Sequence, residues 1–182
     1  MGDTEEKLVE RAKEDPEAFG VLYEMYVDKI YQYVFYRTGN RYDAEDLTAK
    51  TFYKALSNLE RYRYRGLPFS AWLYRIAHNL VANWHRDRKR RTGIPLDSLA
   101  MIGKEGDSAE AFVESHERVE VLRDAISRLP PDRQELLVLK YSTDLSNTEI
   151  GKVMGRSEGA IKALYHRTLT ALRKDLGKRG LQ

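Results

Sequence analysis

Apolar residues recur at spacings of three and four along most of this 182-residue chain, and this spacing favours helices. The clearest run lies between Asp15 and Gly39, where Asp15 is a typical N-cap and Pro16 suits the first helical position. Its apolar positions are Phe19, Leu22, Tyr23, Tyr26, Val27, Ile30 and Val34. No segment has the alternation of a strand. We therefore predict an all-helical fold.

The same spacing predicts two more long helices in the amino-terminal half of the chain. One opens at Asp43, and the other opens at Phe69 after a turn at Gly66 and Pro68. With the helix after Asp15 they would form a three-helix bundle, and a capping pair at residues 3 and 6 marks one further helix start.

A stretch without sustained period separates this bundle from a second helical region. Residues 90–107 contain three glycines and Pro95 and are typical of a linker. We therefore expect two small helical domains joined by a flexible linker. The expected boundaries are 1–91 for the first domain, 92–112 for the linker, 113–177 for the second domain and 178–182 for a tail.

The second domain carries the pattern of a helix-turn-helix. Ser146 and Glu149 form a capping box, Gly155 closes the short helix, and Ser157 caps a longer helix with Ile161 on its inner side. The outer face of the longer helix would present Gly159, Lys162, Ala163, His166, Arg167 and Thr170 to a DNA groove. Two short helices on a generic bundle would give a similar pattern, so this alternative stays open.

Composition excludes several classes of function. The chain has no cysteine and therefore no disulfide or thiolate metal site. It has no apolar run of bilayer length and a charged amino terminus, so we expect a cytoplasmic protein without membrane insertion. Its four histidines are scattered, and it shows neither a nucleophile motif nor a phosphate-binding glycine loop. We expect no enzymatic activity, metal, cofactor or small-molecule substrate.

Charge alternates in sign along the chain. Residues 1–60 hold 8 basic and 13 acidic side chains, and residues 61–91 hold 9 basic and 1 acidic. Residues 92–127 hold 3 basic and 8 acidic, and residues 128–182 hold 11 basic and 6 acidic. Two basic blocks on one chain indicate two contacts with a polyanion, although solvated helical faces would also give this pattern.

The first basic block opens with the segment RYRYRG at residues 61–66. Aromatic rings among guanidinium groups suit single-stranded nucleic acid, since bases stack on the rings and arginines follow the phosphates. The other interpretation is that Tyr62 and Tyr64 cover the bundle. On the helix that follows, we expect an outer face with Arg75, His78, His85 and Arg86, flanked by Asn79 and Asn83, whose amides can bind base edges.

Four segments in order resemble the extracytoplasmic-function sigma factors of bacterial RNA polymerase. They are RYDAEDLTAKTFYKAL, FSAWLYRIAHNLVANWHRDRKRR, LPPDRQELLVLKY and LSNTEIGKVMGRSEGAIKALYHRTLTALRKDL. The resemblance implies a transcription initiation factor that binds core RNA polymerase and promoter DNA. It implies that the first domain binds the minus-ten element, that the second binds the minus-thirty-five element, and that an anti-sigma factor is a further partner.

Residue roles follow from this resemblance. For polymerase binding it points to the helix opening at Asp43, with Asp46, Lys50 and Tyr53, although Ala49 and Lys50 depart from the glutamine and acidic residue usual there. The minus-ten candidates are Arg61, Tyr62, Arg63, Tyr64, Arg65, Phe69, Arg75, Asn79, Asn83 and Arg86. The minus-thirty-five candidates are Ser157, Lys162, Ala163, His166, Arg167 and Thr170.

A second class of protein explains part of the same sequence. A stand-alone helix-turn-helix regulator, with a helical sensor or dimerisation domain, accounts equally well for residues 113–176. It leaves the basic helix and the Arg/Tyr loop without a role, because a sensor domain needs no second surface for nucleic acid.

Overall fold

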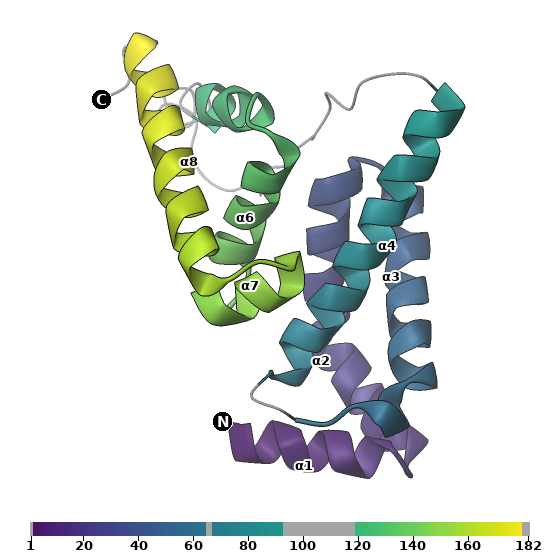
Figure 1. Ribbon diagram of the computed structural model, residues 1–182. Coiled ribbons are helices and arrows are strands. Elements are labelled where there is room, and N and C mark those ends of the chain that lie inside the picture. Colours follow the sequence, from purple (N-terminus) through teal and green to yellow (C-terminus); the bar gives the residue numbers. More distant parts are fainter. Residues whose placement is uncertain (1, 65–66, 93–118, 180–182) are drawn as a thin grey trace, which may run out of the picture.

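The computed structural model describes residues 2–64, 67–92 and 119–179, and all regular elements within these ranges are helical (Figure 1). The first domain consists of α1 (Gly2–Ala12), α2 (Pro16–Thr38), α3 (Arg41–Ser57), η1 (Leu59–Arg61) and α4 (Phe69–Thr92). The second consists of a helix over residues 119–127, α6 (Pro131–Ser142), α7 (Asn147–Met154) and α8 (Glu158–Lys178). The all-helical prediction is confirmed for these residues, whereas residues 93–112 of the expected linker lie outside them.

Local signals set the ends of the helices in the first domain. The Asp15 carboxylate accepts a hydrogen bond from the Glu17 amide at 3.0 Å, and Gly39 ends α2 in the left-handed region with φ of 63°. The predicted start of α3 is wrong by two residues. Asn40 is the N-cap, because its side chain accepts from the Asp43 amide at 3.1 Å.

α1 adds a fourth helix to the predicted three-helix bundle. It lies across one end of the bundle (Figure 1), with Val9 and Ala12 buried and the Glu5 carboxylate accepting a hydrogen bond from the Tyr26 hydroxyl. The centre of the first domain is apolar, and its largest fully buried side chains are Tyr33, Phe69, Leu22, Ile30, Leu73, Val9, Val34 and Val81.

The helix-turn-helix predicted in the second domain is confirmed. Ser146 and Glu149 form both hydrogen bonds of the capping box, and Gly155 has φ of 67°. A methyl group at Gly151 would lie 2.6 Å from the Arg156 carbonyl oxygen, so the glycine is required for the turn to approach α7. Ile150 and Ile161 are fully buried between α7 and α8.

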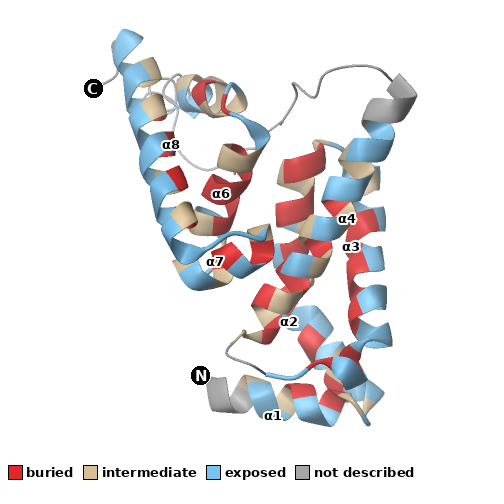
Figure 2. Cartoon of the chain, viewed as in Figure 1, coloured by how far each residue is buried: buried red, intermediate tan, exposed pale blue. Residues whose placement is uncertain are grey.

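The two domains pack against each other. α6 contacts α2, and α7 contacts α4. One hydrophobic cluster continues from the first domain to Leu136 and Leu139 on α6 and to Ile150 and Val153 on α7. Figure 2 shows buried residues on both sides of this contact. The sequence predicted two domains and gave no indication that they share buried surface.

Candidate nucleic-acid interface

The Arg/Tyr loop places its two tyrosines in different surroundings. Tyr62 is 7% exposed, and its hydroxyl donates to the Leu67 carbonyl at 2.9 Å, whereas Tyr64 is 54% exposed. The neighbours of Tyr62, Arg61 and Arg63, are both exposed. Tyr62 therefore covers the helical bundle, which was the alternative interpretation of this segment, whereas the ring of Tyr64 is accessible for stacking.

Phe69 supports this loop from below. It is 1% exposed, and its ring meets Tyr62 edge to face with centroids 5.7 Å apart. Trp72 lies 5.6 Å from Phe69 and 4.9 Å from Tyr62, again between ring centroids. Phe69 was a candidate for minus-ten DNA binding, but its ring is buried, so we assign it to the core. Arg65 lies outside the described residues.

A pocket of about 410 Å³ opens beside the loop, between α3 and α4. It brings together cations and amides over an aromatic and aliphatic floor, and it is lined by Lys54, Asn58, Arg61, Tyr62, Trp72, Ile76, Asn79, Leu80 and Asn83. Such a combination suits a base with its adjoining phosphate. Lys54 on α3 and Asn58, its C-cap, were missed by the sequence analysis; they lie close together because the Asn58 side-chain amide donates to the Lys54 carbonyl at 2.8 Å.

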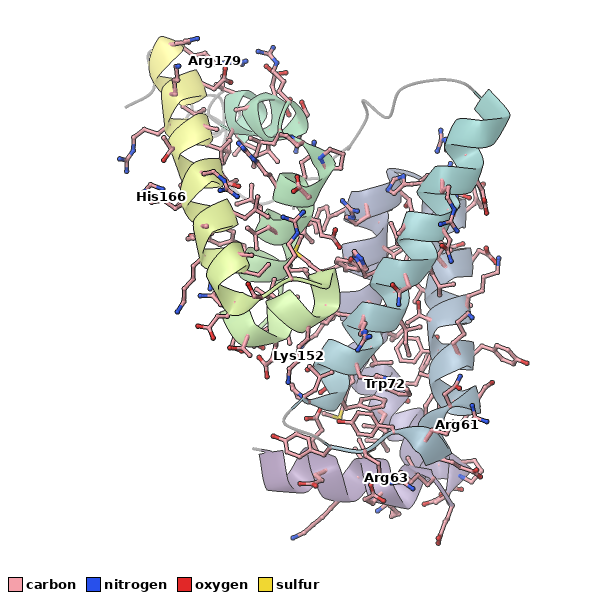
Figure 3. All side chains as sticks on the ribbon, in the orientation of Figure 1. Arg61, Arg63, Trp72, Lys152, His166 and Arg179 are labelled. Carbon is pink, nitrogen blue, oxygen red and sulfur yellow. The ribbon has the colours of Figure 1, made fainter. Side chains whose placement is uncertain are left out.

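Four of the predicted residues on α4 are exposed as expected. Arg75, Asn79, Asn83 and Arg86 reach solvent, and the Arg86 guanidinium donates to the Asn83 side-chain oxygen at 2.8 Å. Figure 3 shows Arg61, Arg63 and Trp72 at the same end of the first domain.

The two histidines of α4 were placed on the wrong face. His78 contacts Glu135 of the second domain, with Nδ1 and Oε1 2.6 Å apart, and His85 is partly buried. Burial and the nearby Arg37 guanidinium lower the pKa of His85 to about 4. Within the described residues no group of histidines and carboxylates has the arrangement of a metal site.

His85 should make the stability of the protein depend on pH. Its ordinary pKa of about 6.5 applies in the unfolded chain, so acid protonates the unfolded state first. We expect the full stability above about pH 6.5 and a loss on the order of 1 to 2 kcal/mol as the pH falls towards 4. Urea denaturation at pH 7 and pH 5 measures this loss, which should be smaller in His85→Asn. An equal loss in both proteins would contradict the assignment.

The predicted polymerase-binding residues form an exposed strip on α3. Asp46 and Lys50 pair with each other at 2.6 Å, and Tyr53 is 72% exposed. Asp46 and Lys50 border a groove of about 570 Å³ between α3 and α4 that also includes Asp43, Trp84 and Asp87. Helical spacing in the sequence did not predict that these residues of α3 and α4 line one groove.

The predicted outer face of α8 is exposed throughout. It carries Gly159, Lys162, Ala163, His166, Arg167 and Thr170, and the N-cap Ser157 is exposed beside it. The Ser157 hydroxyl accepts from the Ala160 amide at 3.2 Å and so caps the helix. Lys162 pairs with Glu158 at 2.6 Å, and Glu158 also accepts from the Thr148 hydroxyl at 2.7 Å. Figure 3 shows His166 on the side of α8 that faces away from the first domain.

An apolar pocket of about 980 Å³ lies in the second domain and was also missed. Its lining includes Leu122, Ile126, Tyr141, Leu169 and Leu176. In the sequence these residues have the spacing of core positions, so nothing in the pattern distinguishes a partly open face from a closed one.

Comparison with known proteins identifies both domains. Residues 22–91 match the family described as Sigma-70 region 2, and residues 120–172 match Sigma-70, region 4. The chain is 34% identical over 174 residues to the ECF RNA polymerase sigma factor SigW of Bacillus subtilis, covering 90% of this chain and 91% of SigW. The chain belongs to the extracytoplasmic-function sigma factors.

A further relative agrees with this family, and a solved structure shares the fold. The ECF RNA polymerase sigma factor BldN of Streptomyces coelicolor is 40% identical over 167 residues, which is 91% of this chain and 63% of BldN. The sigma factor RpoE of Bartonella quintana, solved with the anti-sigma factor NepR, shares the fold with a TM-score of 0.70 and 21% identity, covering 87% of this chain and 96% of RpoE. Sigma factors are non-catalytic transcription initiation factors, so the stand-alone regulator is not favoured. In the part of the chain that is described, no helix is long and apolar enough to cross a membrane.

Proposed function

We propose that this sigma factor captures unpaired bases of the minus-ten element in the pocket between α3 and α4. The observation that carries the proposal is the composition of the pocket, where Arg61, Asn79 and Asn83 surround an aromatic floor. Guanidinium groups hold phosphates and asparagine amides bind base edges. Tyr64 adds an exposed ring on the same loop as Arg61, and Tyr62 and Phe69 hold this loop in place.

The second domain would hold the minus-thirty-five duplex through the outer face of α8. Ala163 leaves room for a close approach to the groove, and Lys162, His166 and Arg167 provide donors for phosphates and guanine edges. The exposed strip of Asp46, Lys50 and Tyr53 would bind core RNA polymerase. The proposed domain limits remain 1–91 and 113–177, with residues 92–112 between them.

The energy balance requires a polymerase. Separating about ten base-pair steps costs on the order of 14 kcal/mol at about 1.4 kcal/mol each. Stacking of two captured bases returns about 2 to 6 kcal/mol. The protein alone therefore cannot hold DNA open, and we propose that it holds extruded bases once it is bound to core polymerase in the cytoplasm.

An anti-sigma factor is a further proposed partner. The sigma factor RpoE of Bartonella quintana was solved with one, and a comparable partner of this chain would cover the proposed DNA-binding surfaces until transcription is needed. We assign no reaction, cofactor or small-molecule substrate to the chain, in keeping with the non-catalytic role of its family.

Replacing Asn79 with alanine tests the minus-ten pocket. In holoenzyme we expect about tenfold slower open-complex formation, because one amide contact worth about 1 to 3 kcal/mol is lost. Permanganate reactivity of the melted strand measures this rate, and binding to core polymerase should be unchanged. Gln32→Ala removes an exposed amide from α2 and is the matched control. An unchanged rate in Asn79→Ala, or equal loss of polymerase binding, would refute the assignment.

A further inference from the structure

A carboxylate is buried where the second domain meets the first. Glu135 on α6 is 3% exposed, and three side chains of the first domain contact it. The Tyr33 hydroxyl donates to Oε1 at 2.6 Å, and Nδ1 of His78 lies 2.6 Å from the same oxygen. The Arg37 guanidinium lies 3.3 Å from Oε2 and also donates to the Pro131 carbonyl at 3.1 Å.

The partners of Glu135 come from two helices of the other domain. Tyr33 and Arg37 lie on α2, and His78 lies on α4. Burial raises the pKa of the Glu135 carboxyl, but the hydrogen bond from His78 and the charge of Arg37 outweigh burial and leave it below the ordinary value. The carboxylate is therefore charged at neutral pH, and contacts across the interface provide its compensation.

This arrangement suits an interface that can open. Apolar contact between α4 and α7 holds the domains together but is non-directional, so it does not select one relative orientation of the domains. The cost of burying the Glu135 carboxylate is offset only when Tyr33, Arg37 and His78 are placed to bind it. When the domains separate, water can solvate Glu135, Arg37 and His78. Removing one partner in the closed state instead leaves an opposite charge buried without compensation.

The closed arrangement is too small to bind a whole promoter, an argument that rests on the proposed function. Elements centred at minus ten and minus thirty-five are about 25 base pairs apart, or about 85 Å of duplex at about 3.4 Å per pair. A compact chain of this length has a radius of gyration of about 16 Å. The two DNA-binding faces cannot reach both elements while α7 lies on α4.

We propose that Glu135, with Tyr33, Arg37 and His78, forms a latch that holds the free protein in a closed, autoinhibited state. Opening of this latch separates the domains before both promoter elements are bound. Binding to polymerase would supply the contacts that replace those lost at the interface.

The absence of cysteine allows the latch to be tested in the free protein by site-specific labelling. Ser57→Cys on α3 and Lys174→Cys on α8 place one exposed label on each domain. Single-molecule Förster resonance energy transfer between fluorophores at these two positions then gives the distribution of distances between the domains. We expect one short-distance population in the parent protein and at least a tenfold rise in the ratio of long to short distances in Glu135→Gln.

Asp132→Asn is the matched control for Glu135→Gln. Asp132 is a carboxylate on the same helix, and it pairs with Arg156 at 2.9 Å within the second domain. Its replacement should leave the distance distribution unchanged. The same distribution in Glu135→Gln and Asp132→Asn would overturn the latch.

A variant in the other domain guards against local unfolding. If circular dichroism shows that Glu135→Gln loses helix, the same distance measurement on His78→Gln tests the latch instead. This variant changes a latch residue on α4 and leaves the sequence of the second domain intact. A rise in long distances supports the latch, and an unchanged distribution overturns it. Since neither polymerase nor DNA is present, this result is independent of the Asn79 experiment, and either proposal can fail alone.

Discussion

Replacing Phe69 with alanine is expected to lower the free energy of unfolding by about 3 to 5 kcal/mol. Its ring is fully buried, and its centroid lies 5.9 Å from that of Tyr26 and less than that from those of Tyr62 and Trp72. Truncation leaves a cavity that these rings cannot all fill, because each is held by further contacts. The Arg/Tyr loop would lose the surface on which Tyr62 rests.

Urea denaturation of the parent protein and of Phe69→Ala measures this loss. Tyr64→Ala is the control, because its ring is exposed on the same loop and its removal should change stability by less than about 0.5 kcal/mol. We expect Tyr64→Ala instead to slow open-complex formation in holoenzyme. A stable Phe69→Ala that is defective only in melting would show that Phe69 meets the DNA after all.

Replacing Gly151 with alanine should cost about 3 kcal/mol of stability in the helix-turn-helix, at the upper end of overpacking effects. The added methyl would lie 2.6 Å from the backbone oxygen of Arg156, which is closer than van der Waals contact allows. The turn also depends on this approach, since the Arg156 amide donates to the Gly151 carbonyl at 2.7 Å. Relief of the clash must move the start of α8, and with it the face proposed to bind the minus-thirty-five element.

Thermal denaturation and binding of holoenzyme to an upstream duplex together measure this effect. Gly177→Ala is the matched control, because a methyl there meets nothing within 4 Å and alanine is the better helix former by up to about 1 kcal/mol. We expect Gly177→Ala to be neutral or stabilising. Equal stability of Gly151→Ala and Gly177→Ala would mean that the turn has room that the structure does not show.

Much of the local structure could be predicted because its causes are local. Asp15, Gly39, Ser146 and Gly155 mark helix ends through hydrogen bonds or backbone angles that involve residues only a few positions away. The start of α3 was placed two residues late because an acidic residue such as Asp43 suits the first turn of a helix, whereas the cap is Asn40, further upstream.

The candidate site was predicted in part. Asn79, Asn83 and Arg75 are exposed as the helical spacing of α4 predicts. The pocket that Asn79 and Asn83 border was not predicted, because Lys54 and Asn58 come from α3 and its C-cap, whose position relative to α4 is fixed by packing. The same is true of Tyr62 and Tyr64, which are equivalent in the sequence and differ only through the presence of Phe69 and Trp72 beneath one of them.

The sequence by itself determined the helices, the helix-turn-helix and the two basic blocks, because periodicity, capping and charge are properties of neighbouring residues. The tertiary structure alone decided which tyrosine is buried and which face of α4 meets the second domain. It also brought Glu135 to Tyr33, 102 residues earlier in the chain. Contacts over such separations depend on how whole helices pack, and helical spacing carries no information about the partner on the other side.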